Sequence, residues 1–218
     1  MRALLDLILP TECGGCRAPG TRWCSACAEQ LHSEPILLRT RVDGVPRAWG
    51  TGPYAGPRRA MVIAAKERGR RDLVSPIGAA WAAAIRCLWE WGELDPPELA
   101  PLCLIPAPSR RAAARRRGGD PVLQAARACA GELDATSVWA ALRSGRGVRD
   151  SVGLSADERM ANLAGRVVVS PRGMPPAHAA VVLVDDVLTT GATAAASTVA
   201  LDRHGVRVQA VLVLAAVQ

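Results

Sequence analysis

Val181 to Thr193 reads Val-Val-Leu-Val-Asp-Asp-Val-Leu-Thr-Thr-Gly-Ala-Thr: an apolar run, two carboxylates and a Thr-Gly turn in direct succession. Four β-formers without polar alternation are typical of a strand that is buried on both faces of a parallel sheet. Ligands of such sheets bind at the carboxyl ends of the strands, where Asp185 and Asp186 fall. The turn opens an Ala-rich helix, and a helix N-terminus offers N–H groups to a phosphate. The stretch therefore predicts a sugar-phosphate site.

In such a site, the two carboxylates and the turn would bind different parts of the ligand. Asp185 and Asp186 would accept hydrogen bonds from the 2′- and 3′-hydroxyls of a ribose, whereas Gly191 would let the backbone approach the phosphate closely. Thr193 adds a hydroxyl and an N–H group at the helix start. One Asp at a strand end is a common turn residue, but two carboxylates with Thr and Gly at these offsets favour a binding site.

Composition limits the class of protein. Half of the 218 residues are hydrophobic, yet no apolar run reaches the ~18 residues of a membrane span. The apolar segment from Leu4 to Leu9 is too short for a secretory signal, so we expect a short amphipathic helix there and a cytoplasmic protein. The net charge of +7 comes from arginine, which is compatible with phosphate ligands or nucleic acid. Lys66 is the only lysine, either a specific ammonium at a tight site or a surface residue.

Two CxxC pairs, Cys13/Cys16 and Cys24/Cys27, lie near the N-terminus with seven residues between them. Four thiolates satisfy a tetrahedral structural zinc ion and leave no coordination position open for catalysis. Two disulfides are the main alternative, but the chain shows no secretion signal, so zinc is favoured. The remaining thiols lie in apolar contexts and are predicted to be buried in the core; they are Cys87, Cys103 and Cys129.

Strand-like and helix-like segments alternate along the chain. We expect strands at residues 48–54, 102–105, 138–143, 166–169, 181–184 and 206–214, and helices at residues 27–31, 57–68, 76–91, 121–133, 155–163 and 192–204. The segment 35–47 is expected to be extended and connecting. This alternation predicts an α/β fold with a doubly wound, mainly parallel sheet.

Two further segments are candidates for chemistry. Pro106-Ala107-Pro108-Ser109-Arg110-Arg111 follows a predicted buried strand, and arginine forks bind phosphate oxygens bidentately. A solvated basic helix face is the other interpretation of Arg110 and Arg111, and both stay open. The Gly- and Arg-rich segment from Arg146 to Leu154 is either a lid over a reactive sugar or an ordinary loop.

Several motifs together resemble those of one family. The four cysteines follow Leu-Asp-Leu-Ile-Leu-Pro, and Tyr54-Ala55-Gly56 precedes the predicted helix with Lys66. Val152-Gly153-Leu154-Ser155 is followed by Glu158-Arg159 and Asn162, and Asp-Asp-x-x-Thr-Thr-Gly-x-Thr closes the series. The last motif resembles the phosphoribosyl-pyrophosphate (PRPP) motif of type I phosphoribosyltransferases. Nearly end to end, the chain is similar to the ComF/GntX family of phosphoribosyltransferase-like proteins.

The resemblance implies a zinc-binding segment at residues 1–45 and a phosphoribosyltransferase-like domain of the type I kind at residues 46–218. It implies that PRPP or a nucleotide-like molecule binds, with Mg²⁺ bridging the pyrophosphate oxygens. The PRPP-binding residues would be Asp185, Asp186, Val187, Leu188, Thr189, Thr190, Gly191, Ala192, Thr193, Ala107, Pro108 and Ser109. The catalytic residues would be Lys66, Arg110, Asp185 and Asp186.

Two functions of different classes follow. One is an enzyme that transfers phosphoribosyl from PRPP to a nucleobase or an amine, through electrostatics and orientation. The other is a non-catalytic ComF-type accessory factor in DNA uptake and recombination, with single-stranded DNA and competence proteins as partners and Arg110–Arg117 in its DNA surface. Relatives usually carry His at Ser109, and the segment from Arg117 to Pro121 also departs from their pattern. An oligomer is compatible with either function.

Overall fold

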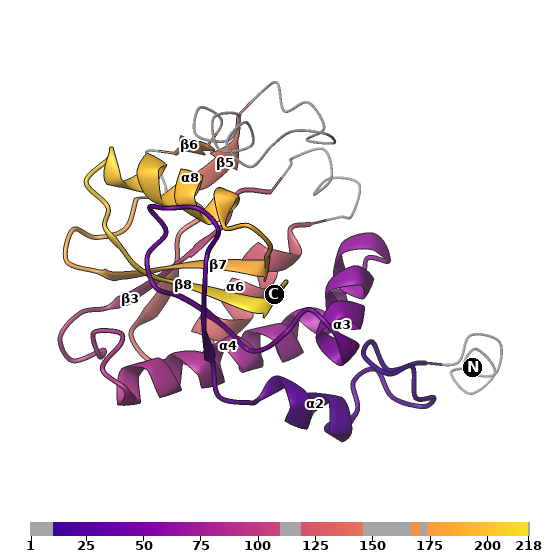
Figure 1. Ribbon diagram of the computed structural model, residues 1–218. Coiled ribbons are helices and arrows are strands. Elements are labelled where there is room, and N and C mark those ends of the chain that lie inside the picture. The colour runs from indigo at the N-terminus through magenta and orange to yellow at the C-terminus, as the bar shows by residue number, and fades with distance from the viewer. Residues whose placement is uncertain (1–10, 110–118, 146–166, 171–173, 218) are drawn as a thin grey trace.

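The computed structural model describes residues 11–109, 119–145, 167–170 and 174–217 (Figure 1). Its centre is a six-stranded sheet in which every neighbouring pair is parallel except the first, which is antiparallel. The strands, in spatial order, are β1 (Ile36–Leu38), β2 (Ala48–Gly50), β8 (Val208–Ala216), β7 (Ala180–Leu188), β3 (Leu102–Pro106) and β4 (Thr136–Val138). The prediction of a mainly parallel α/β sheet is confirmed.

Helices cover both faces of this sheet. The helical elements are α2 (Ser25–Leu31), α3 (Gly56–Glu67), the 3₁₀ turn η1 (Arg71–Leu73), α4 (Val74–Glu90), α6 (Pro121–Ala130) and α8 (Ala192–Asp202). Figure 1 shows α3, α4 and α6 on one side of the sheet and α8 on the other. A small antiparallel sheet of β5 (Leu142–Ser144) and β6 (Val167–Val169) lies on the side of α8.

Strand β7 shows why the sheet needs helices on both faces. Its side chains alternate between two cores: Val182 and Val184 pack with α4 and α6, whereas Val181 and Leu183 pack with α8. All four side chains are at most 2% exposed. The unbroken apolar run is thus explained by burial on both faces, which is the usual environment of a parallel strand.

β7 is longer than predicted, because it continues through both carboxylates to Leu188. Val187 and Leu188 pair with Ala215 and Ala216 of β8, so the strand has a partner for these residues as well. The strand was predicted to end at Val184, because Asp is depleted in strands. Pairing with β8 outweighs that preference.

The prediction of a single strand at residues 138–143 is wrong. Strand β4 ends at Val138, and β5 begins only at Leu142. Between them the chain turns, with the Ala141 N–H donating to the Trp139 carbonyl at 2.8 Å. β4 pairs with β3 in the main sheet whereas β5 pairs with β6, so the two halves serve different sheets.

The other strands and helices that were predicted within the described ranges are present, with ends shifted by a few residues. Cys103 and Cys129 are buried as expected, whereas Cys87 is half-buried. In the ranges that the structure describes, no helix combines the length and apolarity that a membrane crossing requires. The predicted helices at residues 4–9 and 155–163 and the segment 146–154 lie outside these ranges.

Helices α4 and α6 approach each other closely at Gly78. A Cβ atom added there would lie 2.6 Å from Ala128 Cβ and 2.7 Å from the backbone nitrogen of Cys129. Gly131, at the end of α6, has only ordinary contacts at 3.5 Å and beyond, with φ at −72°. The two glycines therefore provide a matched pair of sites for the same substitution.

We expect Gly78→Ala to lower the free energy of unfolding by about 1–3 kcal/mol, because α6 backbone has to move. Gly131→Ala should leave stability unchanged or raise it by a few tenths of a kcal/mol, since only unfolded-chain entropy changes. Urea denaturation of both variants measures the difference. Equal stabilities would contradict the close packing of α4 against α6.

Candidate functional site

The turn after β7 has the backbone geometry that a phosphate loop needs. Gly191 precedes α8 with φ at +90°, a left-handed conformation that glycine adopts without strain. The Thr190 hydroxyl accepts the N–H of Ala192 at 3.3 Å. The following N–H groups, of Thr193 and Ala194, have no acceptor within the helix, as is general for a first helical turn. They are available to a ligand at this end of α8.

A pocket of about 220 Å³ lies at this turn. Asp185 lines it together with one face of β7 and with Val211 and Val213 of β8. The whole run Thr189–Ala194 contributes to its wall. The structure therefore brings Asp185 and the predicted phosphate loop into one cavity at the carboxyl end of β7.

The second carboxylate faces the other side of the sheet. Asp186 contributes to a separate, small apolar cavity between α3, α4 and α6. One of its oxygens, Oδ2, lies 2.8 Å from Lys66 Nζ on α3. The Asp186 side chain is 10% exposed and that of Lys66 is 38% exposed, so the ion pair is largely shielded from water on one side. Alternation along a strand thus gives the two adjacent carboxylates different surroundings.

Ionisation of Asp185 is energetically unfavourable in the folded protein. Burial and the neighbouring charge of Asp186 raise the pKa of Asp185 well above its ordinary value, against the opposing charge of Lys66. The Asp186 N–H donates to Asp185 Oδ1 at 2.8 Å and favours the ionised form. A carboxylate that is costly to ionise alone gains from a ligand that donates hydrogen bonds to it.

The turn after β3 offers little backbone to a ligand. Pro106 and Pro108 have no N–H, and the N–H of Ala107 donates to the Val184 carbonyl at 2.8 Å. The Ser109 hydroxyl donates to Asp120, which caps α6 by accepting from the N–H of Val122. This turn contributes no residue to the pocket at Gly191. Arg110, the other predicted residue here, lies outside the described residues.

A segment that the sequence did not single out packs on the Thr189–Thr193 loop. The Arg41 N–H donates to the Thr190 carbonyl at 3.1 Å. A Cβ atom added to Gly191 would lie 3.3 Å from side-chain atoms of Thr40 and Val42. In Figure 1 this chain leaves α2, passes in front of β7 and β8, and approaches α8. Residues 39–42, which were expected only to connect two elements, therefore form a strap over the loop. No local sequence pattern predicts this contact.

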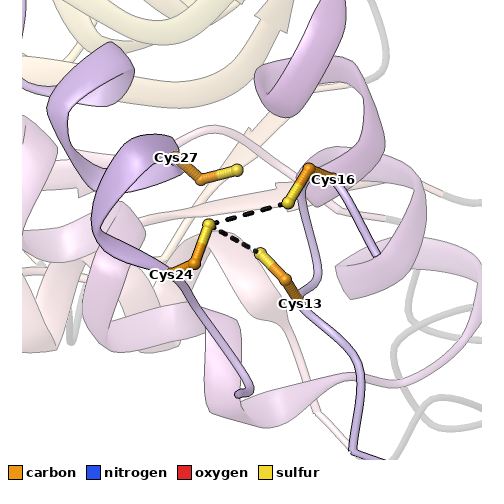
Figure 2. A group of neighbouring side chains, drawn as sticks. All are labelled: Cys13, Cys16, Cys24 and Cys27. Atoms are coloured by element: carbon orange, nitrogen blue, oxygen red, sulfur yellow. Dashed lines mark hydrogen bonds between the residues drawn. The ribbon is translucent and has the colours of Figure 1, made fainter. Parts of the chain in front are cut away.

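The four N-terminal cysteines form a second candidate site. Their sulfur atoms all lie within 4.8 Å of one another, and Figure 2 shows them turned toward a common centre. Cys24 Sγ is 3.7 Å from Cys13 Sγ and 3.6 Å from Cys16 Sγ. A tetrahedral ion with 2.3 Å zinc–sulfur bonds places its sulfurs about 3.8 Å apart. The cysteines are therefore positioned to bind a metal, and the spacing is compatible with structural zinc.

The protonation of these thiols is uneven. Burial alone would raise the pKa of Cys13, but backbone hydrogen bonds from Cys16, Cys24 and Gly15 bring it down to about 6. Burial and the neighbouring thiols instead raise the pKa of Cys27. A cation at the centre would supply the charge that stabilises all four as thiolates.

The cysteine cluster is joined to the domain through α3. A Cβ atom at Gly15 would lie 2.7 Å from Cys27 Sγ and 3.1 Å from Pro57, the second residue of that helix. Arg58, only 8% exposed, donates to the Gln30 carbonyl at the end of α2. Beyond α3, Arg70 donates to the Arg22 carbonyl at 3.2 Å. The first turn of α3 and the segment that follows the helix thus both contact the cysteine segment.

Comparison of the chain with protein-family models and with curated proteins gave no match.

Asn at each carboxylate should change stability in opposite directions. The raised pKa of Asp185 means that the folded state binds this proton more tightly than the unfolded chain, so its contribution to stability falls as pH rises above the ordinary value of about 3.9. Asp185→Asn should therefore be more stable than the parent at neutral pH, and the difference should shrink toward pH 4. Urea denaturation across this range measures it.

Asp186→Asn should lower stability by about 1 kcal/mol, because the Lys66 ammonium loses this carboxylate in a half-shielded setting and this loss exceeds the repulsion of Asp185 that the variant relieves. The same denaturation series includes this variant as the matched comparison. Stabilisation by Asp186→Asn, or destabilisation by Asp185→Asn at neutral pH, would contradict the assigned surroundings of the two carboxylates.

Loss of one cluster thiol should remove the metal. We expect Cys16→Ser to bind no stoichiometric zinc and to lose more than about 2 kcal/mol of stability, since metal binding contributes folding free energy. Cys87→Ser, outside the cluster, should retain the metal. Elemental analysis and thermal unfolding of both proteins measure this. Full metal content in Cys16→Ser would rule out four-cysteine coordination.

Proposed function

We propose that this chain is a phosphoribosyltransferase-like protein that binds PRPP, or another ribose 5-phosphate ligand, with Mg²⁺. One observation carries the proposal: Asp185 and the Thr189–Thr193 loop line a single pocket at the N-terminus of α8. A carboxylate suits sugar hydroxyls, and free helical N–H groups suit a phosphate. The type I fold assignment and the ComF/GntX resemblance are part of this proposal.

In the proposed complex, the 5′-phosphate accepts hydrogen bonds from the N–H groups of Thr193 and Ala194 and from the threonine hydroxyls. Asp185 accepts hydrogen bonds from the ribose hydroxyls. Lys66 neutralises Asp186 across 2.8 Å, so that this carboxylate repels an anionic pyrophosphate less strongly. Mg²⁺, when bound, neutralises pyrophosphate oxygens.

For an enzyme, the transfer step exchanges one bond for another at C1 of the ribose. The bond from C1 to the pyrophosphate oxygen breaks, and its electron pair leaves with pyrophosphate. A lone pair of the acceptor nitrogen forms the new bond to C1, and the acceptor's proton passes to solvent. Asp185 and the phosphate loop would hold C1 in place while this occurs.

A second candidate is a protein that binds the same ligand without turnover, as a ComF-type factor in DNA uptake that contacts single-stranded DNA. It is favoured by the turn at Pro106–Ser109, where the two prolines have no N–H and the Ala107 N–H is already donated to the Val184 carbonyl. Such a turn suits binding of the sugar phosphate better than handling of the leaving group. A cytoplasmic location and competence proteins as partners belong to this proposal.

We further propose that the ion of the cysteine cluster is zinc. Four thiolates and a sulfur spacing near 3.7 Å suit a tetrahedral d¹⁰ cation. A closed Cys₄ shell leaves no coordination position for substrate, so the zinc would be structural.

Calorimetry with PRPP and Mg²⁺ tests the pocket. We expect saturable binding to the parent and at least about tenfold weaker binding to Asp185→Asn, since a hydrogen bond to a charged group contributes about 1.5–3 kcal/mol. Asp202→Asn, an exposed carboxylate at the end of α8, is the control and should bind as the parent does. Absence of binding to the parent protein would refute the proposal.

Pyrophosphate release separates the two candidates. Release in the presence of one member of a panel of nucleobases and amines would establish the enzyme. PRPP binding without release, together with affinity for single-stranded DNA that falls steeply with salt, would establish the accessory factor.

A further inference from the structure

The strap at residues 39–42 borders a second, larger and open cavity beside the Thr189–Thr193 loop. This cavity has a volume of about 430 Å³, against about 220 Å³ for the pocket that contains Asp185. Its walls are the segment from Leu37 to Arg41 on one side and the ends of β7 and β8 on the other. Leu188 and Thr189 line both pockets, so the two share one wall.

The lining of this cavity combines apolar side chains with two arginines. Apolar surface comes from Leu37, Leu38, Leu188 and Val217, and Leu37 and Val217 are 59% and 43% exposed. Among the described residues that line it, Arg39 and Arg41 are charged and none is acidic. Apolar surface next to two guanidinium groups suits a ligand that is apolar at one end and anionic at the other.

The strap is held in place independently of its side-chain charges. Arg41 uses its backbone N–H to reach the Thr190 carbonyl at 3.1 Å, and the residue is exposed. The Thr40 hydroxyl donates to the Val42 carbonyl at 3.1 Å and closes the strap's turn. The backbone thus presents Arg39 and Arg41 to the cavity while anchoring the strap to the phosphate loop.

We propose that this cavity binds a small planar acid, an aromatic carboxylate, whose ring lies on the apolar wall and whose carboxylate pairs with Arg39 and Arg41. Through the shared wall at Leu188 and Thr189, such a ligand would lie next to a sugar phosphate in the first pocket. An acid of this class that also carries a nucleophilic nitrogen would then be the acceptor of the phosphoribosyl group. Its nitrogen would form the bond to C1 as pyrophosphate leaves, a role that rests on the proposed function. Binding of the acid itself does not depend on that function.

Two probes of equal shape separate the contribution of charge from that of ring burial: 1-naphthoate and the uncharged 1-naphthamide. By calorimetry on the full chain, we expect naphthoate to bind saturably and naphthamide to bind at least about tenfold more weakly, since a charge-assisted hydrogen bond is lost. Equal affinities of the two probes, or no saturable binding of naphthoate, would overturn the proposal.

Variants locate the site. Arg39→Met combined with Arg41→Met should weaken naphthoate at least about tenfold, while keeping the backbone bond of residue 41 to Thr190. Arg127→Met, an exposed arginine on α6, is the matched control and should bind naphthoate as the parent does. Equal weakening by Arg127→Met, or none in the double variant, would place the acid elsewhere and overturn the assignment.

PRPP provides the test of adjacency and keeps the two proposals distinguishable. With separate pockets, naphthoate should bind at one equivalent to protein that is already saturated with PRPP and Mg²⁺. Mutual exclusion would overturn the second site and leave PRPP binding intact. Naphthoate binding to a protein that fails to bind PRPP would support the cavity and refute the phosphoribosyltransferase proposal.

Discussion

Strand β7 is hydrogen-bonded to a parallel strand on each side, and the rest of the structure depends on this pairing. β3 accompanies it from Ala180 to Val184, and β8 accompanies it from Val181 to Leu188. Because parallel strands end at the same edge, the turns after β7 and β3 and the end of β8 are brought together. Both pockets near Gly191 lie at that edge. Helices on both faces follow from the same constraint, since an apolar parallel strand has to be covered twice.

Helix α3 links the two candidate sites. Its first turn meets the cysteine segment through Pro57 and Arg58, and its last turn carries Lys66 to Asp186. The buried guanidinium of Arg58 also donates to the Thr51 hydroxyl at 3.2 Å, which in turn donates to β8 at the Leu214 carbonyl. A metal at the cysteines would therefore stabilise a platform on which α3, and with it the Lys66–Asp186 ion pair, is held.

The adjacent carboxylates illustrate how a strand assigns different chemistry to neighbouring residues. Asp186 is neutralised by Lys66 on the face of α3, whereas Asp185 lines a pocket whose described lining residues include no Lys or Arg. A ligand with hydroxyl donors would lower the free-energy cost of ionising Asp185. A residue that destabilises the free protein and benefits from a ligand is common at functional sites.

The sequence alone determined the local features. The apolar run before Asp185 predicted a doubly buried strand, the Thr-Gly turn predicted the start of α8, and the CxxC pairs predicted a cysteine cluster. Each depends on residues within one turn, strand or knuckle, so local pattern suffices.

Only the tertiary structure decided which of these features meet. The strand predicted from the sequence ended four residues before β7 does, and one predicted strand covered both β4 and β5. Both errors arose because strand ends are set by pairing with distant partners. No sequence pattern predicted that residues 39–42 cross the Thr189–Thr193 loop. Nor did any pattern predict that Asp185 lies on the α8 side of the sheet and Asp186 on the side of α3, α4 and α6. Such contacts join residues that are far apart in the chain, and their energy comes from packing and hydrogen bonds that exist only in the folded protein.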